Sequence, residues 1–157
     1  MRNRVARRRE GGQGLVEFAI VIPMFLLIVF SMFDLGRVVW ANDSLANAAR
    51  EGARFASVTG GQTLGGQSSL VTPSTKTDIV NKTNAFNFAG VANVTITVCY
   101  STISASCSGN TDAAGATPVR GNFVTVTIQG IVPMVTGSLI GRGDYTVLGS
   151  STELISN

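Results

Sequence analysis

The chain has no histidine, only two cysteines, and charged side chains at just 13% of its 157 residues. Histidine is the commonest general base of enzymes, and the carboxylates beyond residue 33 show no local pairing in sequence. Two cysteines without histidine are also a poor ligand set for zinc. We therefore expect no catalytic site, no metal site and no cofactor.

Two other catalytic or nucleotide-binding patterns are also missing. Lys76 and Lys82 occur among many hydroxyl side chains, which leaves Ser/Lys chemistry open, but neither lies in an S-x-x-K pattern. The glycine-rich segment 60–66 has no following lysine and no preceding strand, so it does not fit a phosphate-binding loop. The sequence favours a non-enzymatic role.

Positive charge is concentrated at the N-terminus, where the first ten residues contain five arginines and one glutamate. Residues 13–157 carry seven basic and eight acidic side chains, so the formal net charge of +3 comes from the leader. A near-neutral body argues against nucleic acid as a partner.

An apolar run follows the basic leader and extends from Leu15 to Phe33. As a helix these 19 residues would be about 29 Å long, close to the ~30 Å hydrocarbon core of a bilayer. The arginines on its N-terminal side predict a cytoplasmic N-terminus and place residues 34–157 outside. Within the run, Glu17 is the single carboxylate, and a charged group is so costly there that it predicts a functional contact.

A cleaved secretory signal or a plain signal anchor is the alternative interpretation of this N-terminus. A secretory signal has an apolar core of about 7–15 residues, closely followed by a small-residue cleavage site. Here the core is longer and contains Glu17, and the nearest A-x-A match lies at residues 46–48. This pattern favours a retained membrane span.

Several motifs in the first third of the chain resemble those of a known family. They are the basic leader ending at Gly12, residues 13–19 with Glu17, then Pro23, residues 34–37 and residues 48–54. The leader and Glu17 resemble the class III signal of type IV pilins and pseudopilins. The whole set resembles the TadE-like family of tight adherence (Flp, type IVc) pilus assembly proteins.

This resemblance implies a processing site and an assembly site. A prepilin peptidase would cut the bond between Gly12 and Gln13 and free the α-amine of Gln13. Glu17 would then pair with such an amine on a neighbouring subunit and set the axial register. Phe18 stands where major pilins of this class often carry tyrosine, which is a small departure from the pattern.

The chain is also larger than a major Flp pilin, which is little more than the helix. A minor pseudopilin that initiates, caps or decorates the pilus is therefore the expected function. The expected partners are the prepilin peptidase, other pilins and pseudopilins, the membrane platform of the Tad secretion machinery, and the lipid bilayer.

The helix is expected to continue beyond the membrane, because residues 34–58 contain no proline and place apolar residues at helical spacing. Small residues form one face of this continuation, which packs either on the protein's own sheet or on another subunit: Ala48, Ala49, Gly52, Ala53 and Ala56. Asp34 with Arg37, and Glu51 with Arg54, are spaced to pair on the helix surface.

The remaining sequence predicts a small sheet. A short helix is expected from residue 75 to about residue 88, and alternating β-branched residues predict strands around 94–98 and 124–128. A helical turn is expected within residues 133–140, before a third strand from Tyr145 toward Leu154.

We therefore expect an α+β fold in which a long N-terminal helix, half membrane-spanning and half amphipathic, packs on a small antiparallel sheet, as in pseudopilins. Its parts are a basic leader (1–12), a transmembrane helix (13–33) kinked at Pro23, its amphipathic continuation (34–58), a flexible loop (59–73) and an extracytoplasmic domain (74–157). The expected location is the bacterial cytoplasmic (inner) membrane, with the extracellular pilus as a second location after assembly.

Cys99 and Cys107 are predicted to form a disulfide, because the domain that contains them is expected outside the cytoplasm. Such a short loop would stabilise the domain by about 2–3 kcal/mol in the chain-entropy estimate.

A second function also fits the sequence. The chain would then be a single-pass, membrane-anchored extracytoplasmic binding or adhesion domain that never enters a filament. In that case Glu17 makes only a helix–helix contact.

Overall fold

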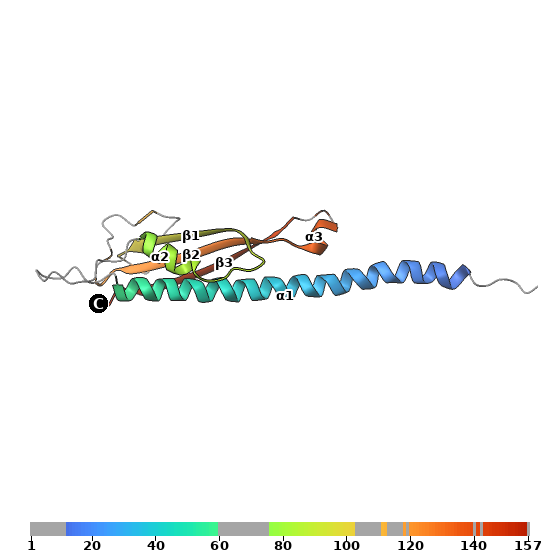
Figure 1. The fold of residues 1–157 in the computed structure, drawn as a ribbon, viewed down its shortest axis with the longest axis horizontal. Helices are drawn as coiled ribbons and strands as arrows, with labels where there is room; N and C mark the ends of the chain where they lie inside the picture. The colour runs from blue at the N-terminus through green and yellow to red at the C-terminus, as the bar shows by residue number, and fades with distance from the viewer. Residues whose placement is uncertain are drawn as a thin grey trace, which may run out of the picture.

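A computed structural model describes residues 12–59, 76–102, 111–112, 118, 120–139, 141 and 143–156 of the chain. The elements follow the order α1 (Gln13–Thr59), α2 (Lys76–Asn84), β1 (Ala92–Ser101), β2 (Phe123–Val132), α3 (Val135–Leu139) and β3 (Tyr145–Leu154). Figure 1 shows the sheet lying along the C-terminal half of α1, while the N-terminal half projects from the body. The predicted α+β fold, a long helix packed on a small antiparallel sheet, is confirmed.

Helix α1 is one continuous element of 47 residues. Beyond residue 33 its sequence has no proline and contains many alanines, which have the highest helix propensity. Two glycines, Gly60 and Gly61, follow Thr59 in the sequence, and glycine is among the poorest helix formers. The helix therefore ends within one residue of its predicted end at 58.

The three strands form one antiparallel sheet in the order β1-β2-β3. The central strand β2 pairs with β3 along its whole length, from Phe123 opposite Leu154 to Val132 opposite Tyr145. The pairing of β1 with β2 is irregular near the start of β1, where Asn93 has a φ of 50°. All three predicted strands are present.

The short helix α2 differs from its predicted extent, since it ends at Asn84 and not near residue 88. A tight turn follows, in which the amide of Phe86 donates to the carbonyl of Thr83 at 3.2 Å. Phe88 then packs against the core at the position where the helix was expected to continue. Helix α3 confirms the helical turn expected within residues 133–140.

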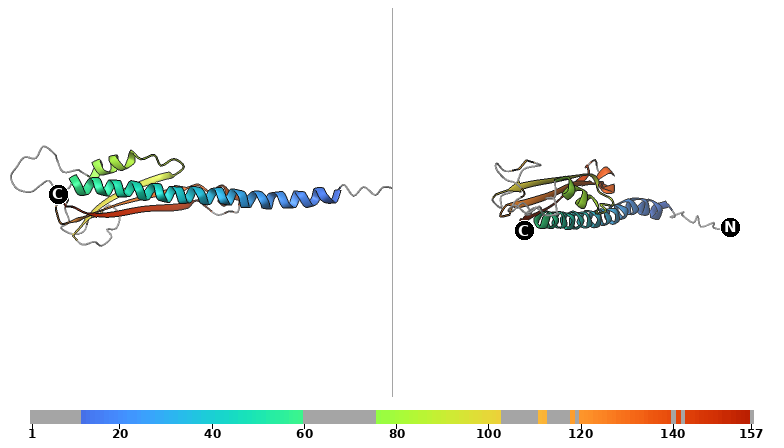
Figure 2. Two further views of the ribbon diagram at one scale, coloured as in Figure 1. Left: turned by 90° about the horizontal axis from the view of Figure 1, so that it is seen from below. Right: turned by 60° about the vertical axis from the view of Figure 1, so that its left-hand side comes forward.

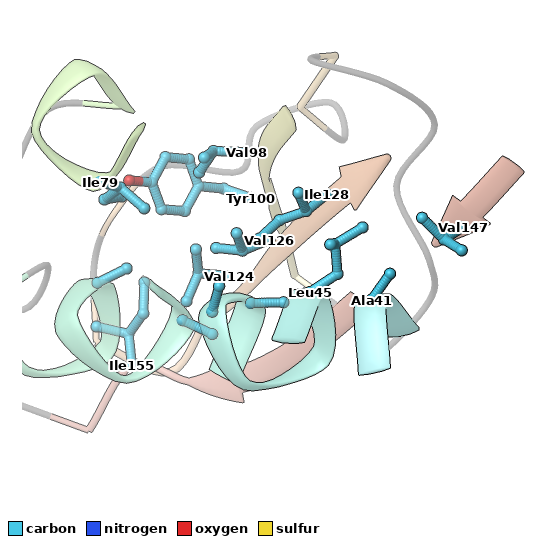
Figure 3. Close-up of a cluster of buried hydrophobic side chains, with 14 of the residues drawn as sticks. Ala41, Leu45, Ile79, Val98, Tyr100, Val124, Val126, Ile128, Val147 and Ile155 are labelled. Atoms are coloured by element: carbon cyan, nitrogen blue, oxygen red, sulfur yellow. The ribbon is translucent and has the colours of Figure 1, made fainter. Parts of the chain in front are cut away.

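The core lies between the sheet and α1. Val124, Val126 and Ile128 are fully buried and share one face of β2, because side chains alternate along a strand. Figure 3 shows these side chains facing Ala41 and Leu45 of α1. The buried positions of α1 that contact this layer are mostly small: Ala41, Leu45, Ala48, Ala49, Gly52, Ala53 and Ala56. The small-residue face thus packs on the protein's own sheet.

Small residues let α1 approach the sheet closely. A Cβ built on Gly149 of β3 would lie 2.5 Å from the backbone carbon of Leu45 and 2.7 Å from the backbone nitrogen of Ala46. A Cβ on Gly52 of α1 would lie 2.5 Å from the Thr83 hydroxyl of α2. Glycine at these two positions therefore brings α1 against β3 on one side and against α2 on the other.

Helix α2 and strand β1 are joined by a polar cluster at one end of the body. Lys76 forms an ion pair of 2.8 Å with Asp112, and the same carboxylate accepts a hydrogen bond of 2.8 Å from the backbone amide of Tyr100. The Lys76 ammonium lies 5.8 Å from the centre of the Tyr100 ring. Burial, reinforced by the Asp112 charge, raises the pKa of Tyr100 to about 12.

Parts of three expected features lie outside the described residues. These are leader residues 1–11, the loop of residues 59–73 beyond Thr59, and Cys107.

Candidate membrane and assembly site

The N-terminal half of α1 carries apolar side chains that the rest of the described structure leaves uncovered. The exposed fraction is 62% for Phe18, 64% for Met24 and 68% for Phe33. Within the described residues, α1 is the one helix long and apolar enough to cross a membrane, and no residue of its most apolar part is buried. A contiguous apolar surface of this kind marks a site of membrane or protein contact. The helix is compatible with a single membrane span.

Glu17 lies near the free end of this surface. Its side chain is exposed, and no described residue forms a hydrogen bond or ion pair with it. Gln13, the first residue of α1, lies one turn earlier, about 6 Å along the helix axis. Gly12 immediately precedes Gln13, and Phe18 is exposed beside Glu17. The structure thus brings the four predicted processing and assembly residues to one uncovered helix end, and their roles remain predictions.

Pro23 lies within α1, which continues on both sides of it. Proline has no amide hydrogen, so it cannot donate the hydrogen bond that would reach the carbonyl of Ala19. The right-hand view in Figure 2 shows the axis of α1 bending within its N-terminal half. The assignment of a kink to Pro23 remains a prediction.

Asp34 marks the point at which α1 enters the body, and its side chain is only 3% exposed. One carboxylate oxygen accepts hydrogen bonds from the Thr136 amide at 2.8 Å and from the Thr136 hydroxyl at 2.5 Å. The other accepts from the amide of Val135 at 3.2 Å. These bonds, led by the Thr136 hydroxyl, hold the pKa of the Asp34 carboxyl below its ordinary value. Asp34 therefore caps the start of α3 from a distant part of the chain.

Arg37 makes a second connection to the same segment. Its guanidinium donates a hydrogen bond of 3.2 Å to the carbonyl of Pro133. The prediction that Asp34 pairs with Arg37 on the helix surface is wrong, because Asp34 is turned to α3 and Arg37 to the end of β2. Among the described residues, Glu51 and Arg54 do not form the predicted pair either.

An apolar groove of about 320 Å³ lies beside these contacts. One wall is formed by Pro23, Leu26, Leu27 and Phe30 of α1, and the other by Leu139 of α3. The body therefore does not stop at the end of the apolar run but extends back along it. In Figure 1, α3 lies over the part of α1 where the colour changes from cyan to blue.

Sequence reasoning did not identify Asp34, Thr136 or Leu139 as parts of one arrangement. Asp34 was assigned to the family motif at residues 34–37, but the only contact predicted for it was a pair with Arg37 on the helix surface. A signal was nevertheless present, since Asp34 directly follows the apolar run, where an unpaired charge is costly. Nothing in the sequence says which of the distant amides would meet this carboxylate.

Cys99 is buried in β1 and is not a free thiol. Cys107 lies outside the described residues, so its predicted pairing with Cys99 remains a prediction. No group of three or more metal-ligating side chains occurs in the part of the chain that the structure describes.

Comparison with known proteins gives one result, at the N-terminus. No curated protein and no solved structure was found to match the chain. The family model described as TadE-like protein matches residues 12–54, a range that begins at Gly12 and includes Glu17 and Asp34. Over this segment the chain is similar to the TadE-like family, and the similarity is consistent with a role in the tight adherence pilus system.

Proposed function

We propose that the chain is a minor pseudopilin that takes part in assembling a tight adherence type IV pilus, by initiating, capping or decorating it. The observation that carries this proposal is the division of α1 into two halves. No residue of the most apolar part of the N-terminal half is buried, and its one carboxylate has no partner among the described residues, whereas one face of the C-terminal half is buried against the body. Because the N-terminal half contributes nothing to the core of the body, neighbouring helices can replace the lipid around it without any change in that core.

The first step in this proposal is proteolysis by a prepilin peptidase after Gly12. Hydrolysis of the bond between Gly12 and Gln13 consumes one water molecule, leaves a carboxylate on Gly12 and frees the α-amine of Gln13. Both residues lie at the uncovered end of α1, and no described residue lies within 4 Å of a Cβ built on Gly12. This exposure leaves room for a membrane peptidase.

The second step uses the new positive charge. The amine of Gln13 on one subunit would pair with Glu17 on another, in the apolar space between their helices. A carboxylate buried without a partner is strongly unfavourable, whereas a paired and hydrogen-bonded one recovers much of its desolvation cost. The pairing would favour the arrangement of helices that brings the two groups together.

The proposed topology has the N-terminus in the cytoplasm and the body outside the inner membrane, as the arginine-rich leader predicts. The proposed partners are the peptidase, other pilins and pseudopilins, and the membrane platform of the Tad machinery. The mature chain would leave the membrane only where it enters the filament.

The test combines the mass of the intact protein with the amount recovered in sheared pili. Gly12→Ala, or loss of the peptidase, should leave the precursor in the membrane and stop incorporation. Glu17→Gln keeps the size of the side chain but removes its charge, so the chain should still be cut while incorporation falls. Asp43→Asn likewise removes the charge of an exposed carboxylate, but on the half of α1 that packs on the body, so it is the matched control and should behave as wild type.

Normal piliation with both Gly12→Ala and Glu17→Gln would reject the proposal. An uncut N-terminus, with function preserved when residues 13–33 are replaced by another span, would instead support an anchored binding or adhesion domain.

A further inference from the structure

The body has a projecting end formed by residues 133–139, here called the tip. It comprises the segment after β2 and helix α3, and it points along the bare half of α1 (Figure 1). The tip contains no charged side chain. Val135 is 49% exposed and Leu139 is 66% exposed.

Contacts with α1 fix the position of the tip along the helix axis. Pro133 lies at the level of Arg37, and Val135 and Thr136 lie at the level of Asp34. Leu139 reaches further and shares a groove with residues of α1 between Pro23 and Phe30. Since Phe30 and the other α1 residues of this groove all belong to the apolar run, Leu139 lies alongside the predicted span.

Several backbone polar groups of the tip have partners, which lowers the cost of contact with hydrocarbon. The amides of Val135 and Thr136 begin α3 and would lack acceptors within so short a helix. Both donate to Asp34. The Ser138 hydroxyl donates to the carbonyl of Val135 at 2.8 Å, and the Ser138 amide to Met134 at 3.4 Å.

An aromatic side chain, Tyr145, lies between the tip and the rest of the body. Tyr145 is opposite Val132 in the sheet, and Val132 precedes Pro133, so Tyr145 lies near the level of Arg37. It is 49% exposed. Tyr145 and Arg37 thus lie at one level along the axis of α1, and the apolar residues of the tip lie further toward the N-terminus of the helix. This is the usual order of side chains at a membrane surface.

We propose that the tip is a membrane-inserting element: Val135 and Leu139 enter the outer leaflet of the bilayer that α1 spans, and a lipid acyl chain occupies the groove between Leu139 and α1. The inference rests on the proposed topology, in which α1 crosses the membrane and the body lies outside. What favours lipid as the occupant is continuity, because four of the five residues that line the groove already belong to the membrane-spanning surface. The body is then held against the membrane at two points, the helix and the tip.

The test uses the full-length chain in vesicles of phosphatidylethanolamine and phosphatidylglycerol, with single tryptophan reporters. Trp40 is the only tryptophan, so Trp40→Phe removes the native tryptophan fluorescence. Leu139→Trp then reports on the tip. Leu154→Trp is the matched control, since Leu154 is an exposed leucine at the far end of the sheet, and Ile28→Trp reports on the span.

Lipids brominated near the carbonyl end or near the chain terminus quench tryptophan at different depths. The reporter at position 139 should lose emission and shift to the blue, most strongly with shallow bromines. The reporter at position 28 should be quenched by deep bromines, and the reporter at position 154 should be unaffected. Val135→Trp repeats the test if Leu139→Trp does not fold.

Each contrary pattern has a distinct meaning. Quenching at position 28 but not at 139 or 135 would overturn the inference and leave the membrane span intact; a neighbouring pilin helix would then be the better occupant of the groove. Equal quenching at 139 and 154 would indicate that the whole body adsorbs, which also overturns it. Absence of quenching at position 28 would reject the proposed topology itself.

Discussion

The carboxylate of Asp34 accepts hydrogen bonds from both the amide and the hydroxyl of Thr136, although the two residues are 102 positions apart in sequence. The contact fastens the connection between β2 and β3 to α1 where the apolar run ends. It is also the point at which a bare helix becomes part of a packed body.

Removal of this carboxylate should destabilise the body. Asp34→Ala should lower the free energy of unfolding by about 2–3 kcal/mol, because it leaves buried amides without an acceptor and removes hydrogen bonds to a charged group. Thr136→Val should cost about 1 kcal/mol. The measurement is denaturant unfolding of the full-length chain in detergent micelles.

A double-mutant cycle isolates the interaction. Asp34→Ala combined with Thr136→Val should lose less than the sum of the single losses, by about 0.5–1 kcal/mol. Asp43→Ala, at an exposed position of the same helix, is the matched control and should stay within about 0.5 kcal/mol of wild type. Simple additivity of Asp34→Ala and Thr136→Val would argue that the two side chains do not act together.

The same carboxylate predicts a pH dependence. Its pKa in the folded state is lowered from an ordinary value of 3.8, chiefly by Thr136 and in small part by Arg37. Its stabilising effect should therefore be complete above pH 3.8 and should be lost as the pH falls through the lower, folded-state pKa. Asp34→Asn should remove this part of the acid sensitivity, and parallel pH profiles of the two proteins would contradict the assignment.

The close approach of β3 to α1 predicts a severe effect of a single methyl group. Gly149→Ala would place its Cβ 2.5 Å from the Leu45 backbone, which neither element relieves by a side-chain rotation. Such overpacking should cost about 1–3 kcal/mol, measured by the same unfolding experiment. Gly143→Ala, with nothing within 4 Å of its built Cβ, is the control. Equal stability of the two variants would show that α1 and β3 lie further apart.

The sequence-based prediction of a disulfide between Cys99 and Cys107 has a direct chemical test. Alkylation of the denatured, unreduced chain should add no mass, whereas alkylation after reduction should modify both cysteines. Replacement of both by serine should lower stability by about 2–3 kcal/mol in the chain-entropy estimate, provided the pair is unstrained. Alkylation of Cys107 without reduction would contradict the pairing.

Periodicity was sufficient to predict most of the fold. Alternation of Val124, Val126 and Ile128 identified both the strand and its buried face, because side chains on a strand alternate strictly. The small-residue face of α1 was visible as well, but not its partner. Close packing on a sheet and close packing on another helix both require residues such as Ala49 and Gly52.

The contacts of the tip were not predictable in this way. Hydrogen bonds from Thr136 to Asp34 and the position of Leu139 beside Pro23 depend on where the β2–β3 connection ends in space. Local spacing instead suggested a pair between Asp34 and Arg37, three residues apart, whose energy on an exposed helix is only a few tenths of a kcal/mol. Burial of Asp34 against α3 offers several hydrogen bonds in place of that weak pair.

The place of β3 in the fold also constrains the order of folding. β3 packs along α1, the first helix of the chain, and Ile155, directly after β3, is fully buried and exchanges two backbone hydrogen bonds with Gly121 and Asn122. These are contacts of large sequence separation, which form late and slowly. If α1 enters the membrane first, the helix is already oriented while the strands cross the membrane. The core can then form only after residue 155 has crossed the membrane.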